Sequence, residues 1–259
     1  MISKVYTFEQ DEINLIPLGD LHIGEQVSFF EKAIDIINKS NENDYFVLLG
    51  DMIDNAIEDS VGDTHNQAFT IQEQIEIMQR IINTGKDKIL GVVAGNHEYR
   101  TAKKVGIEPI KIICSDYSIP YAESLLVLQI AVGKNARRGS NKRIVYNIVV
   151  GHGYSSARTL GGKINANARI MDVIRNADIY ITGHTHQPSV VFNASFEIDK
   201  YNKNVRQYQN ALITTTSFVG YARYAARKFY SPNAFVNLKI NLSGTGQDKV
   251  AKIIHEIYF

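Results

Sequence analysis

The sequence predicts an α/β fold: a four-layer α/β/β/α sandwich of two mixed sheets flanked by helices. Two observations lead to this class. In the first part of the chain, apolar stripes of helical spacing alternate with short β-branched runs, which is the pattern of βαβ units. In the later part, strand-like segments follow one another without helices between them, so we expect a second sheet packed on the first.

Five β-branched apolar runs are expected to be buried strands, because each stops at a glycine and then presents Asp, Asn or His. With the motifs that follow them, they cover residues 13–22 (INLIPLGDLH), 45–54 (YFVLLGDMID), 89–98 (ILGVVAGNHE), 144–153 (IVYNIVVGHG) and 177–186 (ADIYITGHTH). Ligands in open α/β sheets bind at the carboxyl ends of the strands, where each strand delivers its next residue into a shared crevice. We therefore expect these strand ends to form one site.

Three segments are expected to be helices. The first two carry apolar residues at intervals of three and four, and the second stripe ends near Gly85, in the position of a helix C-cap. The stripes consist of Phe30, Ala33, Ile34 and Ile37, and of Ala68, Ile71, Ile75, Met78 and Ile82. A third helix is expected at about residues 163–175, leading into the strand ADIYITG.

The later chain changes character. Residues 125–132 and 143–150 flank the turn-rich loop GKNARRGSNK, which predicts a hairpin. Further strands, expected to form a second and more antiparallel sheet, lie at residues 189–198, 205–217, 234–242 and 250–259. We find no linker or repeat, and we expect one domain over residues 1–259 with both ends of the chain in this scaffold.

Composition excludes little. The 259 residues are 44% hydrophobic and 21% charged, enough for a large core, and the net charge of +1 gives no global electrostatic case for nucleic acid. The single cysteine, Cys114, lies in an apolar stretch and is expected to be a buried thiol in a reducing compartment. No signal peptide and no apolar stretch of ~18 residues occurs, so we expect a cytoplasmic protein without membrane contact.

The strand ends carry carboxylate, amide and imidazole groups without any thiolate, a set suited to Mn, Fe, Zn or Co. These candidates are Asp20, His22, Asp51, Asn96, His97, His152, His184 and His186. They exceed the four ligands of a tetrahedral zinc, which favours two ions bridged by a carboxylate. Taken singly, such an Asp could cap a helix and such a His could be a core residue. His65 and His255 lack this context, and we expect them to be structural.

The motifs Asp20-x-His22, Gly50-Asp51-x-x-Asp54, Gly95-Asn96-His97-Glu98, Gly151-His152 and Gly183-His184-x-His186 occur in one order along the chain. In this order they resemble the calcineurin-like metallophosphoesterase family. The resemblance implies the same four-layer sandwich and two divalent ions, for which we expect Mn²⁺, with Fe, Zn, Co and Ni as alternatives. It implies one ion held by Asp20, His22, Asp51 and His186, and a second held by Asp51, Asn96, His152 and His184.

By similarity to the family, His97 lies beside the two ions and either protonates the leaving-group oxygen or stabilises charge on the phosphorus. Asp54 is expected to accept the other ring N–H of His97 and to fix its tautomer; its alternative is a purely local hydrogen bond. The nucleophile implied by the resemblance is a metal-bridging hydroxide, since bound cations lower the pKa of water from 15.7 to about 7 in the best-studied zinc case.

Three segments outside the motifs are candidates for substrate contacts. Tyr99 and Arg100 follow the GNHE turn, and Arg158 and Lys163 lie in the Gly-rich loop after His152. The third segment, residues 218–230, mixes tyrosines and a phenylalanine with basic residues that include Arg223 and Arg227, a mixture used to bind single-stranded nucleic acid. Its alternative is a packed edge segment with solvated charges.

Three functions follow. The first is a metal-dependent phosphodiesterase, which includes a nuclease, acting on a phosphoester substrate. The second is a phosphomonoesterase acting on a small molecule or a phosphoprotein, because the same centre hydrolyses both bond types across the family. The third is a metal-free interaction scaffold, which has no need of the full set of donors. The sequence does not define the oligomeric state.

Overall fold

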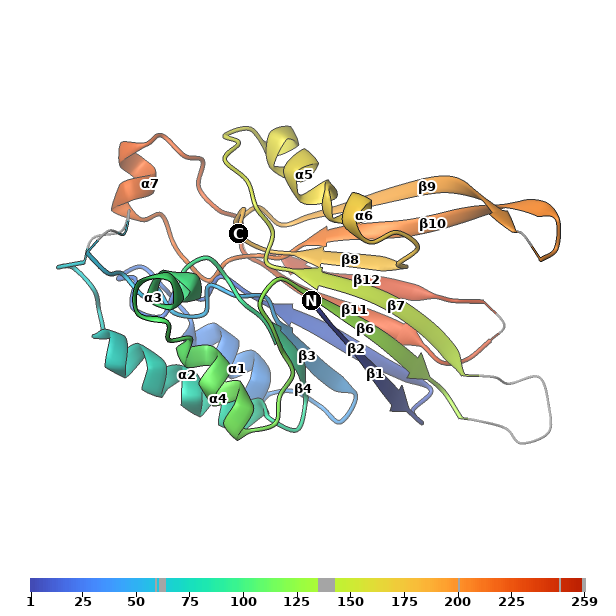
Figure 1. Ribbon diagram of the computed structural model, residues 1–259, viewed down its shortest axis with the longest axis horizontal. Coiled ribbons are helices and arrows are strands. Elements are labelled where there is room, and N and C mark those ends of the chain that lie inside the picture. Colours follow the sequence, from blue (N-terminus) through green and yellow to red (C-terminus); the bar gives the residue numbers. More distant parts are fainter. Residues whose placement is uncertain (59, 61–63, 135–142, 200, 247, 258–259) are drawn as a thin grey trace.

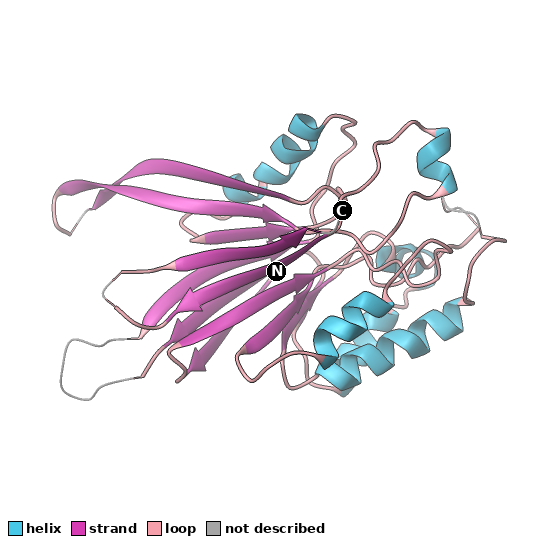
Figure 2. Cartoon of the chain, turned by 180° about the vertical axis from the view of Figure 1, so that it is seen from behind, coloured by secondary structure: helices cyan, strands magenta, loops and turns pink. Residues whose placement is uncertain are grey.

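The structure is a computed structural model that describes residues 1–58, 60, 64–134, 143–199, 201–246 and 248–257. Two β-sheets pack face to face, and helices cover the outer face of each sheet (Figure 1). The view from behind shows the same layers, with helices on both sides of the stacked strands (Figure 2). The predicted α/β class and the predicted order of layers are confirmed.

The first sheet, sheet A, has the strand order β1-β6-β7-β8-β10-β9 among the described residues. β6 pairs with β7 and β10 pairs with β9 in antiparallel fashion, and the other neighbours are parallel. Its strands are β1 (Ile2–Phe8), β6 (Leu125–Val132), β7 (Ile144–Gly151), β8 (Ile179–Thr182), β9 (Ser189–Asp199) and β10 (Asn204–Thr214).

The second sheet, sheet B, has the order β12-β11-β2-β3-β4-β5 within the described part of the chain. β2 to β5 are parallel, and β11 and β12 add an antiparallel edge beside β2. Its strands are β2 (Glu12–Leu18), β3 (Asp44–Leu48), β4 (Ile89–Val93), β5 (Tyr121–Ala122), β11 (Val236–Ser243) and β12 (Ala251–Ile257).

Helices α1 (Glu31–Asn38), α2 (Ile71–Gly85) and α4 (Pro109–Asp116) cover sheet B, and α5 (Leu160–Ala168) and α6 (Ile170–Val173) cover sheet A. The short helices α3 (Glu98–Val105) and α7 (Arg223–Arg227) follow strand ends. α2 starts at a capping box, because Thr70 accepts from the amide of Glu73 while the Glu73 side chain accepts from the amide of Thr70. None of the described helices is long and apolar enough to cross a membrane.

The central strands β3 and β4 of sheet B are buried on both faces, which explains why their sequences are largely continuous apolar runs. In β3, Val47 packs in the core between the sheets, whereas its neighbours Phe46 and Leu48 pack against the helices. A third apolar cluster, which includes Tyr180, Leu212 and Ile170, joins sheet A to α6. Each of the interfaces between layers therefore has its own hydrophobic core.

Two sequence expectations require correction. The late strands do not form a sheet of their own: β9 and β10 extend sheet A beside β8, and β11 and β12 extend sheet B beside β2. The reason is that period-2 alternation shows which face of a strand is buried but not which neighbour it pairs with. The third helix is two helices, α5 and α6, that join at Arg169.

The predicted hairpin is present as β6 and β7, but residues 135–142 of its loop lie outside the described residues. The N-terminal strand β1 was not predicted, because it alternates poorly and lies at an edge of its sheet. Both β1 and β12 belong to the sandwich, as expected for the two ends of the chain.

Candidate metal centre

The motif residues lie at the carboxyl ends of strands from both sheets. β2, β3 and β4 of sheet B deliver Asp20, Asp51 and Asn96, and β7 and β8 of sheet A deliver His152 and His184. The sequence predicted a single crevice, and the structure shows how it forms: the ends of two packed sheets converge. Two clusters of metal-binding groups result, and a further group around His97 shares His22 with the first of them.

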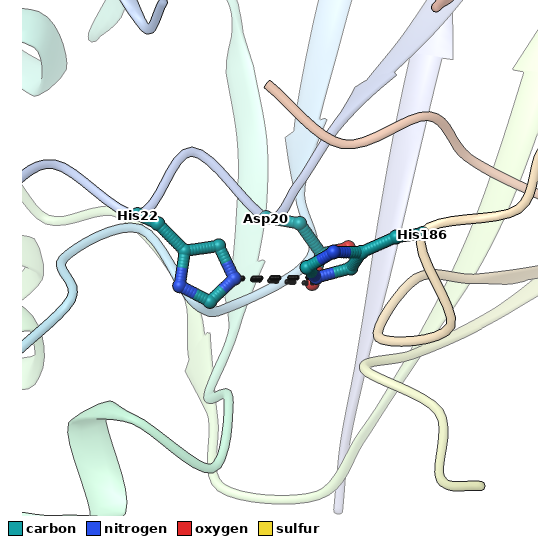
Figure 3. Close-up of side chains that lie close together, drawn as sticks. All are labelled: Asp20, His22 and His186. Atoms are coloured by element: carbon teal, nitrogen blue, oxygen red, sulfur yellow. Dashed lines mark hydrogen bonds and ion pairs between the residues drawn. The ribbon is translucent and has the colours of Figure 1, made fainter. Parts of the chain in front are cut away.

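The first cluster consists of Asp20, His22 and His186 (Figure 3). His186 Nε2 lies 3.3 Å from Asp20 Oδ1 and 3.3 Å from His22 Nε2. Asp20 Oδ1 is buried and accepts no hydrogen bond, while the other carboxylate oxygen accepts from the amide of His184 at 2.9 Å. A buried carboxylate oxygen without a hydrogen bond, facing two imidazole nitrogens, is an arrangement that a cation would satisfy.

The second cluster consists of Asp51, His152 and His184, with Asn96 beside them. His152 donates through Nδ1 to the backbone oxygen of Leu49 at 2.6 Å, so the lone pair of its neutral form is on Nε2. That atom lies 3.1 Å from Asn96 Oδ1, 3.1 Å from His184 Nδ1 and 3.3 Å from Asp51 Oδ2. Oxygen and nitrogen donors thus face a common point, as metal ligands do.

Asp51 lies between the two clusters. Its Oδ2 is 3.3 Å from His152 Nε2 in the second cluster and 3.9 Å from His22 Nε2 in the first. Its Oδ1 accepts from the amide of His97 at 2.9 Å, which fixes the carboxylate plane. Asp51 is therefore the residue placed to touch ions in both clusters.

Five residues of these clusters have a positive φ angle, which non-glycine residues rarely adopt. They are Asp20 (53°), His22 (44°), Asp51 (50°), His184 (63°) and His186 (55°). Conformations of this kind cost about 1–3 kcal/mol each and occur mainly at functional sites. Gly95 packs closely against Asp51, because a Cβ added at Gly95 would overlap the backbone nitrogen and the carboxylate of Asp51.

Glu98, which the sequence analysis gave no role, supports the turn that carries Asp51. It is 1% exposed, and its carboxyl group accepts from the amides of Asp51 at 3.0 Å, Met52 at 2.7 Å and Gly95 at 2.9 Å. Its position in GNHE directly after His97 was the available signal. Asn233, also missed, lies 3.5 Å from His186 Nδ1 and comes from a distant part of the sequence that carries no motif.

His97 and Asp54 lie together, as the sequence analysis expected. His97 donates through Nδ1 to the backbone oxygen of Asp54 at 2.7 Å, and its Nδ1 is 3.2 Å from Asp54 Oδ1. The same carboxylate oxygen lies 3.3 Å from His22 Nδ1. Arg100 donates to His97 Nε2 at 2.8 Å and to the backbone oxygen of Asp54 at 2.8 Å, so Nε2 is an acceptor in this arrangement.

The buried histidines and carboxylates of the site shift one another's pKa values. Burial lowers the pKa of His152, but Asp51 and Asp20 outweigh burial and raise it to about 10. Burial likewise opposes ionisation of Asp51, but His152 and His97 bring its pKa well below the usual value. Asp20 and Asp51 thus create a negative potential around His152. The same negative potential favours a cation, which would bind the ring in its neutral form.

The donor set fits divalent ions. It contains carboxylate and amide oxygens and imidazole nitrogens, and the one cysteine of the chain, Cys114, is buried in α4 instead. The clusters of the described residues therefore consist of oxygen and nitrogen donors. The arrangement favours Mn, Fe, Zn or Co over soft-metal chemistry and does not select among them.

A cleft of about 230 Å³ opens over both clusters. Ser155, Ser156 and Lys163 line one side, and Tyr221 and Tyr230 of the 218–230 segment line another. Lys163 donates to the backbone oxygen of Thr185 at 3.1 Å, and partial burial lowers its pKa. Of the predicted substrate contacts, Arg100 lies beside His97, whereas Arg158, Arg223 and Arg227 are exposed and do not line the cleft.

The chain belongs to the calcineurin-like phosphoesterase family, because the model of that family matches residues 15–188. The matched region runs from β2 to just beyond His186, so it includes each of the five motifs. No curated protein matches the chain.

Solved structures resemble the chain at low identity. A predicted phosphoesterase from Streptococcus pneumoniae TIGR4 is 15% identical, with 96% of this chain and 94% of that chain covered and a TM-score of 0.40. A double mutant of Vps29 from Entamoeba histolytica is 12% identical, with 94% and 99% covered and a TM-score of 0.42. A protein serine/threonine phosphatase from Saccharomyces cerevisiae is 10% identical, with 98% and 84% covered and a TM-score of 0.41.

Proposed function

We propose that the protein is a dinuclear-metal-dependent phosphoester hydrolase that acts on phosphodiesters. The observation that carries this proposal is the position of Asp51, whose Oδ2 faces imidazole nitrogens of both clusters at 3.3 Å and 3.9 Å. One ion would be held by Asp20, His22, Asp51 and His186 and the other by Asp51, Asn96, His152 and His184. When bound, such ions supply an activated water and neutralise charge on the phosphoryl group.

The residues of the chain prepare the site for that chemistry. Leu49 accepts from His152 Nδ1 and so directs the Nε2 lone pair towards the cluster. Asp54 fixes His97 in the same way, through its backbone oxygen and its carboxylate. The strained turns hold the donors in place before any ion arrives, which limits the reorganisation that binding requires.

His97 is the proposed acid that protonates the leaving-group oxygen. Its Nε2 faces Asp51 Oδ2 at 3.8 Å and accepts a hydrogen bond from Arg100. Because Nε2 accepts in this arrangement, it carries no proton there. It can act as the acid only after Arg100 has moved away and Nε2 has taken up a proton from solvent. A phosphate oxygen in the cleft would attract the guanidinium of Arg100, so substrate binding itself would free Nε2. Arg100 is thus proposed to bind phosphate and to gate the acid.

A nuclease is the finer form of this proposal. Tyr221 and Tyr230 line the cleft beside the clusters, and aromatic rings at such a position can stack on bases. Arg223 and Arg227 are exposed on α7, which follows Tyr221, so they could contact phosphates of a longer strand. The alternative remains a phosphomonoesterase, and a metal-free scaffold is disfavoured by the complete sets of donors.

The test compares two substrates on the same protein. Hydrolysis of bis-p-nitrophenyl phosphate and of p-nitrophenyl phosphate is measured with Mn²⁺, with Zn²⁺ and with a chelator. We expect hydrolysis that depends on metal, with the diester favoured. Preference for the monoester would support the phosphomonoesterase, and the absence of hydrolysis with any metal would contradict the proposed activity.

A further inference from the structure

A second and larger cavity, of about 710 Å³, adjoins the metal centre on the side of Asn96 and His152. Asn96 lines both this cavity and the cleft over the clusters, so the two spaces meet at the proposed second metal site. The cavity lies between α3 and the α5–α6 pair, elements that stand near the strand ends in Figure 1. A group bound there would be within reach of a phosphoryl group on the centre.

The size and lining of this cavity do not match a phosphate ion. Pockets of about 300–1,000 Å³ hold organic ligands, and their walls are mainly apolar. Here Leu125 of β6, Ile170 and Val173 of α6 and Ala94 after β4 contribute apolar surface. We name this cavity the ring pocket and define it by these residues together with Tyr99 and Tyr154.

Tyr99 and Tyr154 are unusually exposed for aromatic residues that line a cavity. Tyr99 is 62% exposed and Tyr154 is 72% exposed. The ring of Tyr154 is nearly parallel to that of His184, with an interplanar angle of 12° and centroids 6.3 Å apart. Exposed rings offer flat apolar faces, and a second planar ring stacks on such faces with little dependence on its identity.

The charges of the ring pocket favour an uncharged group. Glu108 and Glu123 line it, and both form ion pairs with Lys111, at 3.4 Å and 2.5 Å respectively. Arg169 is a cation of the same lining. Because the lining carries carboxylates as well as a cation, part of it would repel a polyanion. An uncharged ring is repelled by neither sign of charge.

We propose that the ring pocket binds a planar ring carried by the substrate phosphoester, either a nucleobase or another aryl group. The inference deepens the proposed function and rests on it, because the ring is the organic part of the molecule whose phosphoryl group lies on the metal centre. Tyr99 is the specificity residue of the ring pocket. Stacking on Tyr99 explains why a ring would be preferred to a polyol of similar size.

The experiment measures binding by isothermal titration calorimetry on the metal-loaded protein. The ligands are thymidine 5′-monophosphate, which presents a nucleobase, phenyl phosphate, which presents an aryl ring, and ribose 5-phosphate, which has no aromatic ring. We expect the two ligands with an aromatic ring to bind more tightly than ribose 5-phosphate. Tyr99→Ala should weaken the binding of thymidine 5′-monophosphate by about tenfold, which is the scale of one lost stacking contact. The affinity for ribose 5-phosphate should change little. Tyr99→Phe should retain the preference.

Val173→Trp fills the ring pocket from its other wall and should remove the same preference. Tyr201→Ala is the matched control, since Tyr201 is 97% exposed in the β9–β10 turn and does not line the pocket. Tight binding of phenyl phosphate would identify a general aryl pocket, and tight binding of the nucleotide alone would identify a nucleoside pocket; both support the inference. Equal affinities for all three ligands, or no binding of any, would overturn it.

The readout also separates this inference from the proposed function. Binding of a product-like monophosphate requires no turnover. A protein that binds thymidine 5′-monophosphate through Tyr99 but hydrolyses no phosphoester would retain the ring pocket and refute the activity. A protein that hydrolyses bis-p-nitrophenyl phosphate with Mn²⁺ but prefers no ring would retain the activity and refute the ring pocket.

Discussion

Replacing Glu98 by Gln tests whether its buried carboxyl group positions the bridging carboxylate. One carboxyl oxygen accepts from the amide of Met52 at 2.7 Å and of Ile53 at 3.4 Å, and the other accepts from Asp51 at 3.0 Å and Gly95 at 2.9 Å. Glutamine is nearly isosteric but replaces one oxygen with an NH₂ group. Whichever way its amide turns, at least one short hydrogen bond is lost and two donors face each other.

The expected loss of stability follows from leaving one of these backbone N–H groups without its acceptor. A buried N–H group left without an acceptor costs about 1–3 kcal/mol, so Glu98→Gln should lower the free energy of unfolding by at least that amount. The same change loosens the turn that carries Asp51, so the metal content should also fall. Urea unfolding followed by circular dichroism gives the first quantity, and elemental analysis after dialysis gives the second.

Glu42→Gln is the matched control, because Glu42 is exposed. Substitutions of exposed residues usually change the free energy of unfolding by no more than about 0.5 kcal/mol. One result would refute the reasoning: a Glu98→Gln protein with unchanged stability and full metal content. Burial and Asp51 raise the pKa of Glu98, and the amide donors oppose them. An unchanged variant would show that the protonated form, which glutamine resembles, already predominates in the wild type.

Four further outcomes are expected. Chelator-stripped protein should be inactive and regain activity with Mn²⁺; full activity after verified removal would contradict the metal centre. Asp51→Asn should empty both metal sites, whereas Asn96→Ala should weaken mainly one, as elemental analysis would show. His97→Asn should keep its metals and lose about 10²–10⁴-fold in kcat for alkyl leaving groups, less for nitrophenol; equal losses would exclude an acid role. Arg223→Ala with Arg227→Ala should flatten the salt dependence of single-strand cleavage by about 0.7 in log–log slope per lost contact; an unaltered slope would argue against a nuclease.

The early strands and the motifs were predictable because their signals are local. A β-branched run that stops at Gly50 or Gly95 specifies both a buried strand and the turn that follows it. The helical stripe of α2 was predicted to within a few residues, and its end at Gly85 is confirmed. Such features depend on a handful of neighbouring residues, which the sequence displays directly.

The pairing of the late strands was not predictable, because it depends on residues far apart in sequence. β11 carries Leu238, Ile240 and Leu242 on one buried face, a pattern that either sheet could accommodate. The buried position of Glu98 was hidden for a similar reason. In the sequence, a charged residue directly after His97 resembles an exposed residue at the start of a helix. The structure shows instead that its carboxyl group accepts from amides of the turn at Asp51 and from the amide of Gly95.

The metal centre depends on the spacing between the two sheets as much as on its donors. His152 of sheet A donates across the interface to Leu49, which follows β3 of sheet B, at 2.6 Å. The amide of His184, after β8 of sheet A, donates to Asp20, after β2 of sheet B, at 2.9 Å. Each cluster therefore has a hydrogen bond that joins the sheets. Because packed cores resist compression and shear, the apolar interface between the sheets fixes the distance between these donors, and the core acts as part of the site.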